Sequence, residues 1–173
     1  MNSSSEKRSG DEASKNPIWQ QGPNERTRNN SSNFFGKKMT KEFQIIGSLK
    51  GLDDLRVHLE KTALAWSLSQ NQLVEINLIL EEICSNYIEH GESNALNSIK
   101  IQLILENSLL SIRITDEGPE FDPTTVSDPD VHLPIDKRKA GGLGLYFVKH
   151  YTDSISYRRI NNTNNLFIEK KIK

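Results

Sequence analysis

Three polar residues that recur every four positions are the first candidates for chemistry in this chain. Glu82, Asn86 and His90 each advance only about 40° around a helix, so they form one polar stripe. An asparagine oxygen is a neutral ligand suited to magnesium, and a carboxylate one turn earlier could orient or deprotonate an attacking hydroxyl or water. Taken alone, this spacing more often marks a solvated helical face.

A second candidate group begins where an apolar strand ends, at Asp116-Glu117-Gly118. An ionised aspartate only accepts hydrogen bonds, so Asp116 could take one from an adenine amino group. Gly118 permits the close approach of another group or unusual backbone angles. Asp-x-Gly after a strand is also a common turn, and that is the commoner meaning of the pattern when it stands alone.

A third group is the glycine-rich segment 140–145, Ala-Gly-Gly-Leu-Gly-Leu, which opens the last predicted helix. Backbone N–H groups at a helix start, together with the positive end of the helix dipole, suit a phosphate chain. The segment is neither a P-loop nor a dinucleotide-binding fingerprint, because no Lys-Ser/Thr follows it and no strand directly precedes it. A flexible hinge remains the alternative interpretation.

Hydrophobic periodicity predicts the elements that would position these groups. Alternation at Phe43 and Ile45 predicts a first strand from residue 42, and Ile- and Leu-rich runs predict two hairpins. Asp53 and Asp54 suit the start of a helix. Apolar residues three and four apart predict a helix whose core stripe is Leu73, Ile76, Leu80, Ile83 and Tyr87. We expect helices at 51–66, 72–90 and 142–152, hairpin strands at 98–105 and 109–115, and a closing hairpin of 154–160 and 165–172 around a turn at 161–164.

Composition limits the classes of protein to consider. A chain of 173 residues with 35% apolar residues can form one core beside a tail. A formal net charge of -1 argues against a general nucleic-acid binder. The one cysteine, Cys84, excludes an internal disulfide and fits a reducing, cytoplasmic setting. No apolar run approaches the roughly 20 residues needed to span a bilayer, so we expect no membrane partner.

The N-terminal part differs from the rest. Residues 1–40 are rich in Ser and Asn without apolar periodicity, so we expect a disordered tail followed by one domain at 41–173. Met39 precedes the first predicted strand, and a second hypothesis is that translation starts there.

The three groups, in this order on a helix, a strand end and a helix start, resemble the nucleotide-binding boxes of the GHKL ATPase superfamily. Within it, segments 82–91, 116–123 and 141–149 look like those of the anti-sigma factor serine/threonine kinases, over residues 41–173. The resemblance implies an α+β fold of the GHKL (Bergerat) type. This is a two-layer sandwich with a mixed, mainly antiparallel sheet of about five strands and three main helices on one face.

The resemblance also implies roles for individual residues. Glu82 would be the catalytic base, Asn86 the magnesium ligand, Asp116 the adenine contact and Gly118 a wall of the pocket. Residues 121–140 would form a lid over ATP. The remaining expected nucleotide contacts are His90, Phe121, Lys139, Gly141, Gly142, Leu143, Gly144 and Leu145. Some relatives carry a basic residue where this chain has Ala140, and Lys137, Arg138 and Lys139 could substitute for it.

The implied activity is transfer of the γ-phosphoryl group of ATP, with magnesium, to a serine or threonine of a STAS-type anti-anti-sigma protein. Such kinases also sequester a sigma factor and usually form homodimers. A competing hypothesis is a binding module that uses ATP or ADP occupancy to change its partner affinity without phosphorylating anything.

Overall fold

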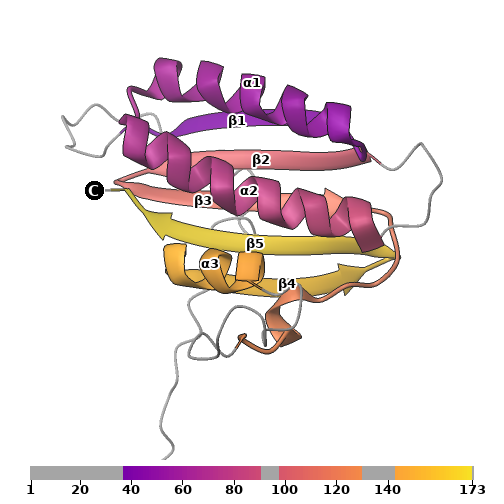
Figure 1. Cartoon of the computed structure of the whole chain (residues 1–173). Helices are drawn as coiled ribbons and strands as arrows, with labels where there is room; N and C mark the ends of the chain where they lie inside the picture. The colour runs from indigo at the N-terminus through magenta and orange to yellow at the C-terminus, as the bar shows by residue number, and fades with distance from the viewer. Residues whose placement is uncertain (1–36, 91–97, 130–142, 173) are drawn as a thin grey trace, which may run out of the picture. The chain divides into compact units, whose positions relative to one another are not determined.

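The computed structural model describes residues 37–90, 98–129 and 143–172 (Figure 1). The strands of this part form one sheet in the order β1-β2-β3-β5-β4. All of its ladders are antiparallel, so the described sheet has no parallel pair. The strands are β1 (Met39–Ile46), β2 (Ser98–Glu106), β3 (Leu109–Asp116), β4 (Ser154–Ile160) and β5 (Thr163–Lys171). The helices are α1 (Leu49–Trp66), α2 (Gln70–His90), the 3-10 turn η2 (Pro123–Thr125) and α3 (Leu143–Tyr151).

Both predicted hairpins are present, and each closes with a two-residue turn. Asn107 and Ser108 have φ angles of 51° and 62°, and Asn161 and Asn162 have φ angles of 49° and 60°. Two consecutive residues with positive φ define the turn that matches the twist of paired strands. The second turn is shorter than predicted, because β5 begins at Thr163 and not at residue 165.

Caps at the helix starts explain why two helices begin earlier than predicted. The Ser48 side chain accepts a hydrogen bond from the Gly51 backbone at 3.2 Å, so α1 begins at Leu49 and not at residue 51. The first turn of α1 therefore contains no acidic residue, and the expected benefit of Asp53 and Asp54 at the helix start is wrong. Asp53 instead contacts Arg56 at 3.4 Å.

A reciprocal cap begins α2. The Ser69 backbone donates to the Gln72 side chain at 2.7 Å, and the Gln72 backbone donates to the Ser69 hydroxyl at 3.3 Å. This capping box starts α2 at Gln70, two residues before the predicted start. The predicted core stripe is confirmed, with Leu73 partly buried and Ile76, Leu80, Ile83 and Tyr87 buried.

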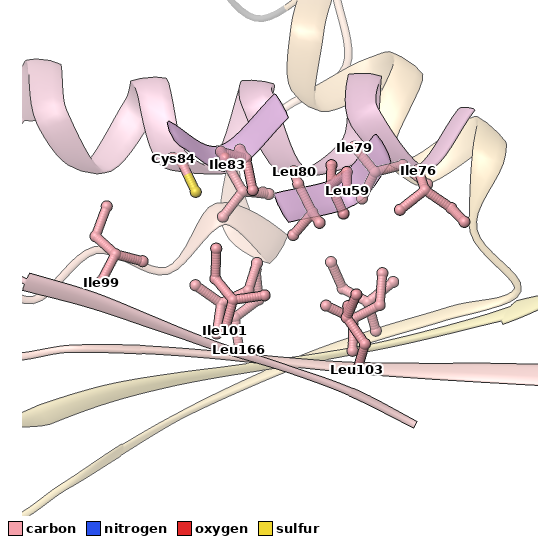
Figure 2. Close-up of a cluster of buried hydrophobic side chains, with 14 of the residues drawn as sticks. Leu59, Ile76, Ile79, Leu80, Ile83, Cys84, Ile99, Ile101, Leu103 and Leu166 are labelled. Atoms are coloured by element: carbon pink, nitrogen blue, oxygen red, sulfur yellow. The ribbon is translucent and has the colours of Figure 1, made fainter. Parts of the chain in front are cut away.

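The core lies between the helices and one face of the sheet. In Figure 1 the three helices cover the same face, and Figure 2 shows side chains of α1 and α2 opposite those of the strands. Ile79, Leu80 and Ile83 of α2 are fully buried, as are Ile101 and Leu166 of the sheet. Burying each such side chain stabilises a fold by about 1.5–3 kcal/mol. The predicted two-layer α+β fold is confirmed.

Some sequence predictions lie outside the described residues. These are the expected tail up to residue 36, most of the expected lid, and the residues Lys139, Gly141 and Gly142. Met39 is the first residue of β1 and pairs with Leu105, so it lies within the strand and not before it. None of the described helices is long and apolar enough to cross a membrane.

Candidate functional site

Asp116 is the last residue of β3 and is only 6% exposed. Its Oδ1 atom accepts hydrogen bonds from the Gly118 backbone at 2.8 Å and from the Asn164 side chain at 2.9 Å. Its Oδ2 atom is buried and has no hydrogen-bond partner among the described residues. The Asp-x-Gly turn therefore uses one carboxylate oxygen and leaves the other for a donor from outside.

Burial raises the pKa of Asp116 above the usual value of a carboxyl group, while Asn164, the Gly118 N–H group and the charge of Arg159 act in the opposite direction. A buried carboxylate oxygen without a donor is costly, so the site suits a ligand that supplies an N–H group. The exocyclic amino group of adenine is such a donor. The residues at the end of β3 therefore fit the adenine contact expected there.

Asn164 connects the end of β3 to the turn that follows it, a role that sequence reasoning missed. It is fully buried on β5 directly opposite Asp116, and its amide also donates to the Pro119 carbonyl at 2.9 Å. Its Oδ1 atom accepts hydrogen bonds from the Tyr157 hydroxyl and from Arg159, each at 2.7 Å. The sequence placed Asn164 in a turn because a run of asparagines is typical of turns. Only the pairing of β3 with β5 reveals its position.

Glu82 and Gly144 meet where α2 passes α3. A Cβ atom added to Gly144 would overlap the carboxylate of Glu82, so the glycine is what allows this approach. Glu82 is half-buried, and burial, followed by the charges of Glu81 and Glu89, raises its pKa. A carboxylate with a raised pKa is a stronger base, which favours proton abstraction near neutral pH.

Asn86 lies one turn after Glu82 and is also half-buried. Its Nδ2 atom donates to the Glu82 backbone carbonyl at 2.6 Å. A carbonyl only accepts hydrogen bonds, so the nitrogen of the amide must face it and Oδ1 lies at the other end. Oδ1 is the atom that magnesium would take. The described residues contain no cluster of three or more His, Cys, Asp or Glu side chains that could hold a metal.

Two α2 residues connect the Glu82 region to the end of β3. The charge of Asp116 is the second cause, after burial, that raises the pKa of both Tyr87 and Cys84. Burial raises the pKa of Cys84 to about 12, so this thiol is unreactive. Tyr87 contacts Phe121 edge-on, with ring centroids 6.3 Å apart. The catalytic and adenine-binding candidates therefore belong to one region around the C-terminal half of α2.

The remaining predicted contacts divide into three groups. Phe121 packs against the core, and Leu145 of α3 is 5% exposed within it, which leaves the backbone of Leu145 to serve a nucleotide. Leu143 is 42% exposed at the start of α3. His90 ends α2, but its side chain lies outside the described structure, as do Lys139, Gly141 and Gly142.

Lys149 of α3 fixes the beginning of the expected lid. Its Nζ atom donates to the Val126 carbonyl at 2.6 Å and to the Asp128 carboxylate at 2.9 Å. Asp122 and Pro123 form the start of η2, where Asp122 accepts a hydrogen bond from the Thr124 backbone at 2.9 Å. Asp122 and Pro123 thus begin a short turn, and the segment that follows it is attached to α3.

The chain is similar to several bacterial protein kinases. It is 28% identical over 110 residues to the serine/threonine-protein kinase BtrW of Bordetella bronchiseptica, a match that covers 62% of this chain and 77% of the relative. It is 23% identical over 105 residues to the serine-protein kinase RsbW of Bacillus mycoides, which covers 58% of this chain and 66% of the relative.

A solved structure has the same fold. The crystal structure of the RsbU and RsbW domains of a Mycobacterium tuberculosis protein aligns with a TM-score of 0.56 at 10% identity. The alignment covers 78% of this chain and 32% of the mycobacterial chain. Residues 48–170 match the histidine kinase-like ATPase domain. This match spans more than half of the chain, which therefore belongs to the histidine kinase-like ATPase family.

Proposed function

We propose that this protein is an ATP-binding anti-sigma factor with serine/threonine kinase activity. The observation that carries the proposal is the Glu82 carboxylate, which has a raised pKa and lies against Gly144 in the first turn of α3. A proton acceptor thus lies beside the helix start that suits phosphates. The named activities of the bacterial relatives support the same conclusion.

The protein would bind ATP between the end of β3, which holds the adenine, and the start of α3, which holds the phosphates. Asp116 and Gly118 would bind the adenine, and the Oδ1 atom of Asn86 would bind magnesium. The N–H groups at the start of α3 would bind the phosphates. The other contacts that we propose are His90, Phe121, Lys139, Gly141, Gly142, Leu143, Gly144 and Leu145.

When bound, ATP would supply the γ-phosphoryl group. The bond from the γ-phosphorus to its bridging oxygen breaks, the hydroxyl oxygen of a serine or threonine of a second protein forms the new bond, and ADP leaves. Glu82 orients that hydroxyl and accepts its proton. The Asn86 amide is held by its bond to the Glu82 backbone carbonyl, one helical turn from the Glu82 carboxylate. Such transfer depends on positioning and on neutralised charge more than on covalent chemistry by the protein.

The acceptor in this proposal is a STAS-type anti-anti-sigma protein, and the regulated target is a sigma factor. The protein would act as a homodimer in the cytoplasm. The domain boundaries follow the same proposal, with a kinase domain up to residue 173 and a lid over ATP at 121–140. The expected boundary after residue 40 moves to the start of β1 at Met39, because Met39 and Thr40 pair with β2.

Substitution Glu82→Gln tests the proposed role of the carboxylate. Wild-type protein incubated with γ-labelled ATP and magnesium should label one small protein on Ser or Thr in a lysate of its own source. The variant should lose this labelling but keep ATP binding, because the amide cannot accept the proton. Saturating Mg-ATP, at about 100 times its dissociation constant, should stabilise both proteins by roughly 2.7 kcal/mol.

The matched control is Glu81→Gln, the same change one residue earlier on α2. Glu81 pairs with Arg56, and burial, the largest cause of the raised pKa of Glu82, remains without the Glu81 charge, so this variant should keep most of the labelling. Labelling that persists in Glu82→Gln would contradict the base assignment. ATP binding by the wild type without any labelling would instead favour the nucleotide-dependent binding switch.

A further inference from the structure

Two unpaired polar atoms come from residues that interact across the adenine-binding region. Among the described residues, three buried side-chain polar atoms have no hydrogen-bond partner, namely the Tyr87 hydroxyl, Arg113 Nε and Asp116 Oδ2. Tyr87 is 8% exposed and Asp116 is 6% exposed. Buried polar groups without partners are uncommon because they lose their bonds to water. Asp116 already has a proposed ligand, and Tyr87 requires an explanation of its own.

Tyr87 is placed by α2 and by the beginning of the expected lid. It directly follows Asn86 and lies on the core stripe of α2, with its ring edge-on to Phe121 at 6.3 Å. The charge of Asp116 raises the pKa of Tyr87, so the hydroxyl lies within electrostatic reach of that carboxylate. The ring is thus packed in the core against Phe121, and its buried hydroxyl belongs to the same region as Asp116.

The two unpaired groups are chemically complementary to one edge of a purine. An ionised carboxylate only accepts hydrogen bonds, whereas a phenol hydroxyl can donate one. In adenine the 6-amino group is a donor, and the ring nitrogens on either side of it, N1 and N7, are acceptors. An adenine whose amino group donates to Asp116 would therefore bring a ring nitrogen, N1 or N7, toward the Tyr87 hydroxyl, which has no described partner.

We propose that Tyr87 is a second base-recognition residue, whose hydroxyl donates a hydrogen bond to the ring nitrogen beside the amino group held by Asp116. The bond forms directly or through one bridging water. This inference rests on the proposed function, since it requires ATP at Asp116. The pair selects a 6-aminopurine, because guanine would present its O6 acceptor to the carboxylate.

Binding of base-modified nucleotides tests the inference. Affinities of ATP, 1-deaza-ATP and 7-deaza-ATP would be measured by calorimetry for the wild type and for Tyr87→Phe. We expect the variant to bind ATP about three- to ten-fold more weakly, the range of one neutral hydrogen bond. One of the deaza analogues should bind the wild type more weakly than ATP does, by a similar factor. The same analogue should bind the variant with the same affinity as ATP does. That analogue identifies the ring nitrogen involved.

Stability separates base recognition from a structural role. Tyr87→Phe removes a hydroxyl without a protein partner, so the unfolding midpoint of the ligand-free variant should equal or exceed that of the wild type. The matched control is Tyr151→Phe, at the last residue of α3. The ring at this position remains beneath the Lys170 ammonium group. This control should bind ATP like the wild type.

The outcomes are distinct. The inference would be overturned if wild type and Tyr87→Phe bound ATP with equal affinity. It would also be overturned if the affinity loss caused by each deaza analogue were the same in the variant as in the wild type, so that substitution and analogue acted independently. Both results would leave ATP binding intact. A lower unfolding midpoint without any change in analogue selectivity would assign the hydroxyl to the fold and also overturn it. A wild-type protein that binds no ATP would overturn the proposed function itself.

Discussion

At the scale of single residues, Asp116 uses its two carboxylate oxygens differently. Oδ1 bonds to Gly118 and Asn164, and Oδ2 has no described partner. In Asp116→Asn the amide oxygen can keep the bonds of Oδ1, while an NH2 group replaces Oδ2. Two donors would then face each other if adenine bound, so we expect ATP affinity to fall by roughly 10- to 100-fold. Calorimetric titration measures this, and unchanged affinity would remove Asp116 from the adenine site.

The same substitution should change how stability depends on pH. Burial raises the pKa of Asp116, so the folded state binds this proton more tightly than the unfolded chain does. The stabilising contribution is complete below the ordinary carboxyl pKa and is lost as pH rises through the higher folded value. The free energy of unfolding, measured in urea, should therefore fall more for the wild type than for Asp116→Asn when the pH rises from roughly 4 to 7. A pH-independent difference between the two proteins would contradict this.

The sequence identified those candidate site residues whose spacing is local. Glu82 and Asn86 are one helical turn apart, and Asp116 and Gly118 share one turn, so each pair can be recognised without knowledge of the fold. Asn164 could not be found in this way, because its contact with Asp116 joins residues 48 apart in the chain. The apolar period of α2 placed Tyr87 in the core but carried no information about its hydroxyl.

At the scale of helices and strands, periodicity predicted each described strand and α-helix, while the short turn η2 was not predicted. Short polar contacts set several of the ends of these elements. Ser48 and Ser69 move two helix starts outward, and the Asn161-Asn162 turn lengthens β5. Side-chain caps and two-residue turns act over three or four residues, which is shorter than the window needed to detect a period. For this reason the elements were predicted more accurately than their boundaries.

The contact between α2 and α3 gives a prediction at this scale. In Gly144→Ala the new methyl group would displace the Glu82 carboxylate, which is the movable end of a long side chain. Alanine also favours a helix by up to about 1 kcal/mol relative to glycine. We therefore expect nearly unchanged stability in urea but a loss of phosphoryl transfer on the order of 100-fold.

Gly51→Ala in α1 is the matched control. Its methyl group would meet the backbone carbonyl of Ile46, which cannot move aside as a side chain does. This variant should lose about 1–3 kcal/mol of stability through overpacking. Its transfer rate, measured well below its unfolding midpoint, should remain that of the wild type. The reverse pattern in the two variants would show that Gly144 supports the fold and not the position of Glu82.

At the scale of the whole domain, α2 and α3 are joined at two places. Glu82 lies against Gly144 near one end of α3, and Lys170 of β5 connects the helices near the other. Lys170 is 8% exposed, and its Nζ atom lies 2.7 Å from the Glu75 carboxylate and donates to the Tyr151 carbonyl at 2.9 Å. A cavity of about 610 Å³ opens beside this ion pair. The Lys170 contact therefore fixes the ends of α2 and α3 that lie away from the proposed ATP site.

Substitution Lys170→Met would leave Glu75 without its cation and the Tyr151 carbonyl without its donor. The side chain of Glu75 is 36% exposed, so water offsets part of the loss, and we expect urea unfolding to show about 1–3 kcal/mol less stability. Adding Glu75→Gln should recover part of this, because the unpaired charge is then removed. Lys171→Met is the control, since that side chain is 73% exposed and lies 3.8 Å from Asp153. Equal stability of the two lysine variants would mean that α2 and α3 keep their relation through the apolar core alone.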